Sequence, residues 1–241
     1  MKANRSMIGA AALALGLAVT IQAPAQAAEA KAPDARVLAA QKIMLQYGIP
    51  TGTADGVSGP QTLRGLCTFR RMSGIGTSRA ALDTKTYNTL VAYAKKYPRI
   101  TDIPASSYLG NATYLVAQET CQAMVYVKNN RYQKAMAIST GVSGHATPNG
   151  RYVIGSTDRG WHCSSLYPEG CGTHDVGRFA YISNFGNMYN RRHITGAVYV
   201  HGSTDVPTYP ASHGCIRVTV TDSDWMYDNV GTIPTYVTGA Y

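Results

Sequence analysis

The chain has 241 residues, of which 45% are hydrophobic and 15% are charged. A disordered chain and a collagen are excluded, because apolar segments are spread along the whole sequence. The length suits one large globular domain or two small ones.

The first 27 residues have the pattern of a secretory signal peptide. Lys2 and Arg5 form a basic start, residues 7–21 are an apolar run, and residues 25–27 (Ala-Gln-Ala) form a small-residue cleavage site. The apolar run is shorter than the roughly 20 residues that a membrane-spanning helix needs. We therefore expect an exported protein without stable membrane insertion.

Without residues 1–27 the chain has 20 Lys and Arg against 13 Asp and Glu, which gives a charge of about +7. Outside a cell, this charge favours anionic polymers or lipid surfaces over nucleic acid as partners. Solubility alone explains the charge equally well, because the basic residues form no dense run. The sequence carries no signal for the oligomeric state.

The number of cysteines is odd, so an exported chain is expected to keep one free thiol beside two disulfides. Spacing alone favours a short loop closed by Cys163 and Cys171, which leaves Cys67 to pair with Cys121. Cys215 is then the free thiol.

A zinc site is the alternative for the central cysteines. Cys163 and Cys171, together with His162 and His174, could supply four ligands. In an oxidising compartment a disulfide is the favoured outcome for such a cysteine pair. We therefore expect no metal and no other cofactor.

The first part of the chain predicts a small three-helix module over residues 35–97. Apolar residues recur at helical spacing in three short segments, each bounded by capping or breaking residues. The boundary signals are Gly48, Ser73, Gly74, Pro98 and the expected N-cap Asp83.

Residues 98–111 are rich in turn formers and predict a linker, and residues 112–241 are predicted to be mainly β. The fold class is therefore α+β, and Asn129-Asn130 is expected to form a tight hairpin turn. The predicted strands are 113–116, 123–127, 134–139, 151–154, 197–200, 217–220 and 232–237.

The densest chemical signal is the segment 212–217 (Ser-His-Gly-Cys-Ile-Arg), preceded by His201-Gly202. A thiol needs a nearby base to become a nucleophile, and glycine lets backbone N–H groups approach a reacting carbonyl. Strand alternation places Cys215 and Arg217 on one face, where a guanidinium could hold a substrate carboxylate beside the thiol.

The residue types alone leave two questions open. Either His201 or His213 could be the base, and an isolated cysteine is more often a buried small hydrophobe. The combination favours a cysteine–histidine catalyst, because an unpaired cysteine beside glycine and histidine in an oxidising compartment lacks a structural explanation. The acidic residues Asp222 and Asp224 suit a helix start and need no catalytic role.

Residues 201–202 and 212–217 together resemble the signature of the L,D-transpeptidase (YkuD-type) catalytic domain. The segments 139–141 (Ser-Thr-Gly) and 147–150 (Thr-Pro-Asn-Gly) resemble upstream parts of the same family, so the resemblance covers about residues 112–238. It implies a mainly β, sandwich-like fold and a cell-wall or periplasmic enzyme acting on peptidoglycan stem peptides.

The resemblance also implies roles for particular residues. Cys215 would be the nucleophile, His201 its base, and the Gly202 carbonyl would orient the imidazole. The backbone around His213, Gly214 and Cys215 would form an oxyanion hole. Ser212 and Arg217 would contact the peptide.

Residues 35–97 resemble a peptidoglycan-binding domain, although Gly65 and Arg70 stand where its pattern has Ala and Gln. Cys67 falls on a position of that domain that is usually exposed, which suits a disulfide with Cys121 that ties the two domains together. The module would add peptidoglycan glycan as a partner.

Only ten residues separate His201 from Ser212, fewer than the family leads us to expect. We expect a short loop over residues 203–211, held by Pro207 and Pro210. Two alternatives to a cross-linking transferase stay open at this point. They are a cysteine hydrolase of stem peptides, in which water replaces the acceptor amine, and a non-catalytic wall-binding protein.

Overall fold

The structure is a computed structural model that describes residues 32–155, 158–164, 166 and 186–241. Residues 32–241 form one compact unit. The predicted signal peptide lies outside the described residues. The helices are α1 (Ala35–Gln46), α2 (Pro60–Met72), α3 (Thr84–Lys96), the 3₁₀ turn η1 (Ile100–Asp102) and α5 (Val220–Asn229).

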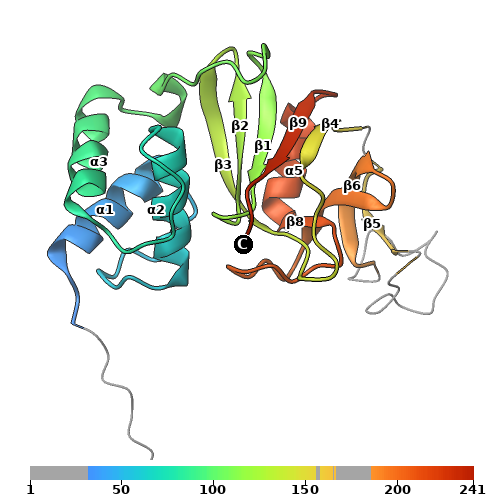
Figure 1. The fold of residues 1–241 in the computed structure, drawn as a ribbon, viewed down its shortest axis with the longest axis horizontal. Coiled ribbons are helices and arrows are strands. Elements are labelled where there is room, and N and C mark those ends of the chain that lie inside the picture. Colours follow the sequence, from blue (N-terminus) through green and yellow to red (C-terminus); the bar gives the residue numbers. More distant parts are fainter. Residues whose placement is uncertain (1–31, 156–157, 165, 167–185) are drawn as a thin grey trace, which may run out of the picture. The chain divides into compact units, whose positions relative to one another are not determined.

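The three-helix module is confirmed, and its helices begin where capping chemistry directs them (Figure 1). Asp34 accepts hydrogen bonds from the backbone N–H groups of Arg36 and Val37 at the start of α1. Pro60 opens α2, where its missing N–H costs nothing. The predicted N-cap Asp83 accepts a hydrogen bond from Thr86 N at 2.7 Å and starts α3.

Arg70, which departs from the pattern of the peptidoglycan-binding domain, joins α2 to the start of α3. Its buried guanidinium lies 2.9 Å from the Asp83 carboxylate and donates to the carbonyls of Ser78, Ala80 and Ala81. These bonds satisfy a buried cation with several acceptors at once, so Arg70 fixes the turn between the two helices.

The β part is a mainly antiparallel sheet that follows the helices, and its fold class matches the α+β expectation (Figure 1). In the described part of the chain the strand order is β4-β9-β1-β2-β3-β8-β7-β6-β5, with β1 parallel to β9 and β7 parallel to β8. The strands are β1 (Tyr114–Gln118), β2 (Ala123–Lys128), β3 (Arg131–Ser139), β4 (Gly150–Val153), β5 (Trp161–His162), β6 (Met188–Thr195), β7 (Val198–Ser203), β8 (Ile216–Thr219) and β9 (Pro234–Thr238).

Strands β1 and β2 are buried on both faces, which explains why they read as continuous apolar runs. Tyr114 and Val116 pack with the helical module, in one core with Phe69 and Leu90. The alternate side chains, such as Leu115, belong to a second core that includes residues of α5. The helical module and the sheet therefore share a core.

The segment expected to be a linker, residues 98–111, packs against this shared core. Ile103 is fully buried and accepts a backbone hydrogen bond from Tyr132, and Ala105 donates one to Asn130. The rings of Tyr108 and Tyr236 pack in a tilted arrangement with their centroids 4.4 Å apart. These contacts hold the connection between the two parts in place.

Among the described residues, no helix is both long and apolar enough to cross a membrane.

A disulfide joins Cys67 of α2 to Cys121, which follows β1, as expected from the sequence. Both residues are fully buried, which differs from the exposed position expected for Cys67. Cys163 is also disulfide-bonded. Its expected partner Cys171 lies outside the described residues, so that pairing stays a prediction.

Replacing Cys67 and Cys121 together by alanine is expected to lower the free energy of unfolding by about 4 kcal/mol. The bond spans 54 residues, and a cross-link of this span restricts the unfolded chain strongly. Thermal unfolding should show a loss of about 10 °C in Tm for a chain of this size. Peptide mapping without reduction provides the control, and a freely alkylated Cys67 in the native protein would contradict the bond.

Candidate active site

Strands β7 and β8 bring the predicted site residues together. The two strands are parallel neighbours in which His201 pairs with Arg217 and Val200 pairs with Ile216. Paired residues of neighbouring strands project from the same face of a sheet, so His201 and Arg217 share one face. Val200 and Ile216 point to the other face, where both are buried in the second core.

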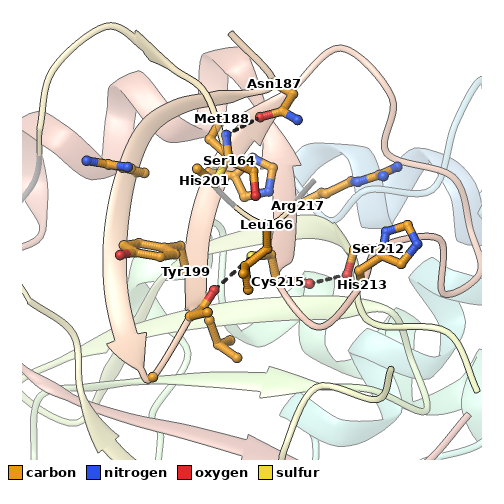
Figure 2. A pocket seen from close by; sticks show the side chains of 14 residues that line it. Ser164, Leu166, Asn187, Met188, Tyr199, His201, Ser212, His213, Cys215 and Arg217 are labelled. Atoms are coloured by element: carbon orange, nitrogen blue, oxygen red, sulfur yellow. Dashed lines mark hydrogen bonds between the residues drawn. The ribbon is translucent and has the colours of Figure 1, made fainter. Parts of the chain in front are cut away.

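A pocket of about 540 Å³ opens on the face that carries His201 and Arg217 (Figure 2). Five of the seven residues predicted for the cysteine chemistry line it, and the other two, Gly202 and Gly214, are chain neighbours of lining residues. The five are His201, Ser212, His213, Cys215 and Arg217.

His201 is 5% exposed, and its ring is oriented by its own backbone neighbour. Nδ1 lies 3.0 Å from the Gly202 carbonyl oxygen. Because a carbonyl only accepts, Nδ1 carries the proton and donates, which leaves Nε2 with a lone pair in the neutral ring. The pKa of His201 is lowered to about 4, mainly by burial and in part by the nearby positive charge of Arg217, while the Gly202 hydrogen bond acts in the opposite direction.

Close packing against neighbouring side chains leaves no room for a side chain at Gly202. A Cβ atom at this position would lie 2.9 Å from Ser223 Cβ and 3.0 Å from Tyr189 Cβ. Any side chain would push β7 away from α5 and β6, and would move the carbonyl that orients His201.

Among the described cysteines Cys215 is the one without a disulfide, and it directly precedes β8. Its Sγ lies 3.7 Å from the carbonyl oxygen of Ala197, the residue before β7. Burial raises the pKa of the Cys215 thiol, while a backbone hydrogen bond from Tyr199 and the charge of Arg217 lower it in part. The pKa shifts of Cys215 and His201 both favour the neutral thiol and the neutral imidazole at neutral pH.

The turn that presents Cys215 is held by hydrogen bonds from two directions. Ser212 Oγ donates to the Cys215 carbonyl at 2.5 Å and accepts from Gly214 N at 3.2 Å. Thr147 Oγ1 donates to the Gly214 carbonyl and accepts from Gly141 N, both at 2.9 Å. The upstream segments 139–141 and 147–150 therefore support the cysteine turn. Gly214 has φ +113°, a conformation that side-chain-bearing residues rarely adopt.

Arg217 forms an ion pair with Asp205, with Nη1 3.1 Å from Oδ2. The arginine side chain is 23% exposed and the aspartate side chain 72% exposed. Arg217 thus lies partly inside the pocket wall, while its partner carboxylate comes from the loop 203–211.

The two candidate bases differ in their surroundings. His213 is exposed, and its ring lies 5.1 Å from the ring of His145. His201 is buried, with Nδ1 tied to a carbonyl, which is the arrangement that a positioned general base needs. The geometry therefore favours His201.

Several pocket residues were missed in the sequence, and they come from β6, from the turn that follows it, from the start of β7 and from residues 164, 166 and 187. Arg191 lines the pocket, pairs with Asp158 at 3.1 Å and lies over the Tyr199 ring at 5.5 Å. Tyr199 shares the strand alternation of His201, so that alternation could have identified it. The other lining residues that were missed are Ser164, Leu166, Asn187, Met188, Gly196, Ala197 and Val198.

The acidic residues after the motif have structural roles. Asp222 lies in the first turn of α5 and pairs with Lys134 at 2.9 Å. Asp224 accepts hydrogen bonds from Tyr189 and Asn190 of β6. In the part of the chain that the structure describes, no group of three or more metal-ligating side chains occurs. His174, like Cys171, lies outside the described residues.

The sequence pattern of the YkuD family, described as the L,D-transpeptidase catalytic domain, matches residues 112–237, which is more than half of the chain. An L,D-transpeptidase from Xylanimonas cellulosilytica is similar in structure at 24% identity, with a TM-score of 0.53, covering 90% of this chain and all of that one. One from Stackebrandtia nassauensis is 18% identical with a TM-score of 0.49 and covers 88% of this chain and 94% of that one.

The comparison with curated proteins gives no match. The structural likeness concerns the fold, and the family pattern covers the strands that carry His201 and Cys215. The chain therefore belongs to the YkuD family of L,D-transpeptidase enzymes.

Proposed function

We propose that this enzyme cross-links peptidoglycan outside the cytoplasm by acyl transfer through Cys215. The observation that carries the proposal is the strand register, because it aligns His201 with Arg217 on the face where Cys215 lines the same pocket. The disulfide between Cys67 and Cys121 supports an oxidising compartment, which agrees with export.

In the first half-reaction, the Cys215 sulfur attacks the carbonyl carbon of the third stem residue, at the L-to-D bond of a tetrapeptide donor. His201 Nε2 takes the thiol proton during the attack, since thiol and imidazole are both neutral beforehand. The same proton then passes to the leaving nitrogen, and the C–N bond breaks. D-alanine leaves, and the donor stays bound to Cys215 as a thioester.

In the second half-reaction, an amine of another stem attacks the thioester carbonyl. His201 removes a proton from the amine, the new amide bond forms, and the C–S bond breaks. The sulfur recovers the proton from His201, which returns the enzyme to its starting state. The product is a wall cross-link.

The negative oxygen that develops at each tetrahedral stage needs hydrogen-bond donors, and we assign these to the backbone of residues 213–215. Gly214 N–H already donates to Ser212 Oγ at 3.2 Å. To bind an oxyanion, this N–H must break that long hydrogen bond or donate to both oxygens at once. Arg217 holds a carboxylate of the donor peptide beside the thiol, a task for which a guanidinium is suited.

The helical module is proposed to bind glycan. A second pocket of about 200 Å³ lies at the start of α2, and most of its lining is polar or glycine. Its polar side chains are Thr51, Thr53, Asp55, Gln61 and Thr62. Hydroxyl, amide and carboxylate groups offer the donors and acceptors that sugar hydroxyls require. Sedimentation of the mature protein with purified sacculi measures this binding.

Mass spectrometry of products from purified tetrapeptide muropeptides tests the proposed reaction. Cross-linked dimers with one D-alanine released per cross-link are the expected products. Shortened monomers without dimers would replace the transferase with a hydrolase. Binding to sacculi without any product would contradict enzymatic activity on these stems.

A further inference from the structure

The loop over residues 203–211 joins the strand of His201 to the turn of Cys215, and it is held largely by the helical module. Three consecutive carbonyls of this loop accept side-chain hydrogen bonds. Arg64 donates to Pro207 O, Arg79 donates to Thr208 O at 2.5 Å, and Ser139 donates to Tyr209 O at 2.7 Å.

Arg64 is a buried cation of α2, with 3% of its surface exposed. It also lies 3.4 Å from the Ile138 carbonyl at the end of β3, and its Nε has no hydrogen-bond partner among the described residues. Burial, together with the charge of Arg79, lowers the pKa of Arg64 to about 10, so the side chain remains positive at neutral pH. A buried charge is costly unless its donors are bonded, and the bonds of Arg64 go to the carbonyls of Pro207 in the loop and Ile138 in the sheet.

The loop in turn reaches the pocket through Asp205. The Asp205 carboxylate is the partner of Arg217, whose guanidinium lines the pocket beside Cys215. The loop's other end is tied separately to the sheet, because Ala211 N and Ser212 N both donate to Thr140 O. Asp205 is also bonded to Ser203, because its N–H donates to Ser203 Oγ and its carbonyl accepts from that hydroxyl. Losing Arg64 would therefore loosen the segment that follows Asp205 more than the cysteine turn.

We infer that Arg64 is a positioning residue for acyl transfer, through which the helical module sets the position of Asp205 and hence of Arg217. This inference rests on the proposed function of the pocket. It assigns the module a part in donor binding in addition to glycan binding. The short connection between His201 and Ser212 is thus held by donors from the helical module, in addition to the local bonds between Ser203 and Asp205.

Steady-state kinetics of the full mature chain test the inference. Arg64→Met keeps an unbranched apolar stem and removes the donors, and it is expected to raise the KM for the donor tetrapeptide about tenfold. The value of kcat should stay within about threefold, because His201 and Cys215 keep their own supports. Arg64→Lys, which retains one charged donor, should recover part of the loss.

Arg71→Met is the matched control, since Arg71 lies on the same helix and contacts Tyr108, not the loop. It should leave KM unchanged. Arg79→Gln removes a partly exposed contact to the loop and should raise KM in the same direction as Arg64→Met. It thus provides a second test if Arg64→Met does not fold.

A double-mutant cycle separates positioning from simple destabilisation. Asp205→Asn alone should raise KM, and it should add little in the Arg64→Met background, because both changes act through Arg217. If the KM increases of the two single variants multiply in the double variant, the two residues act independently, and the route through Asp205 is overturned. An unchanged KM in both Arg64→Met and Arg79→Gln would overturn the inference itself.

Hydrogen exchange supplies a readout that needs no catalysis. Amides in residues 203–211 are expected to exchange at least about tenfold faster in Arg64→Met, while those of Arg71→Met match the native protein. Unchanged exchange in Arg64→Met would show that Arg64 does not hold the loop. A native protein that makes no dimers would overturn the proposed function, whereas exchange would still decide whether Arg64 holds the loop.

Discussion

Replacement of Cys215 by alanine is expected to lower the rate of dimer formation and D-alanine release by at least about 10⁴-fold. The reaction depends on a thioester, and only a nucleophile at this position can form it. The neighbouring Ser212 hydroxyl cannot take over, because it is engaged with the Cys215 carbonyl at 2.5 Å and accepts from Gly214 N. Product mass spectrometry measures the loss.

Stability measurements control for a folding effect of this variant. Cys215 is partly exposed at the pocket, so truncation to alanine should leave Tm within a few degrees of the native value. Binding to sacculi should also persist, because the helical module is unchanged. Dimer formation at more than about one hundredth of the native rate in Cys215→Ala would exclude Cys215 as the nucleophile.

His201→Gln is expected to lower kcat/KM by about 10³-fold, since it removes the proton acceptor from the thiol and leaves the fold intact. His193→Ala is the matched control, because His193 is an exposed histidine on the neighbouring strand β6 and lies outside the pocket lining. It should retain native activity. Greater loss in His213→Ala than in His201→Gln would assign the base to His213 instead.

The pH profile of the native enzyme follows from the pKa of His201. Only the neutral imidazole accepts a proton, so kcat/KM should be flat from about pH 5 to 8 and should fall as the pH drops through about 4. Removing the positive charge in Arg217→Met should move this acid limb upward, because Arg217 contributes to the lowered pKa. An acid limb near pH 6.5 would instead indicate a solvated histidine.

Turns, helix starts and strand ends were predictable, because they depend on residues close together in the sequence. Asn129 and Asn130 have φ of +52° and +56°, as expected for the hairpin between β2 and β3. Asp83 caps α3 as expected. Most predicted strands occur within a few residues of their expected ends, since alternation and turn formers bound them.

Strand β6 was not predicted, because its inward side chains do not read as apolar. Met188, Asn190, Arg192 and Ile194 are the buried positions of an alternating pattern, and two of these four are polar. Arg192 donates to the carbonyls of Met226, Val230 and Gly231 around the end of α5. A charged residue paired with backbone carbonyls leaves no hydrophobic pattern to detect.

The candidate site was predictable only in part, because some of its contacts join a side chain to a distant backbone carbonyl and leave no pattern in the sequence. The spacing of residues 212–217 and the alternation around His201 identified the residues at the centre of the pocket. The contact of Arg64 with Pro207 spans 143 positions of the chain. It uses a backbone carbonyl, which every residue has, so the residue type at position 207 does not predict it. Tertiary contacts of this kind become visible only in the fold.

Acyl-enzyme capture tests the central claim most directly. The mature protein is mixed with a tetrapeptide donor without acceptor, quenched in acid, and digested with pepsin for mass spectrometry. We predict that the peptide containing Cys215 gains the mass of the donor minus D-alanine, and that the adduct is absent in Cys215→Ala. An adduct on another residue, or product release without any adduct in the native protein, would contradict the account.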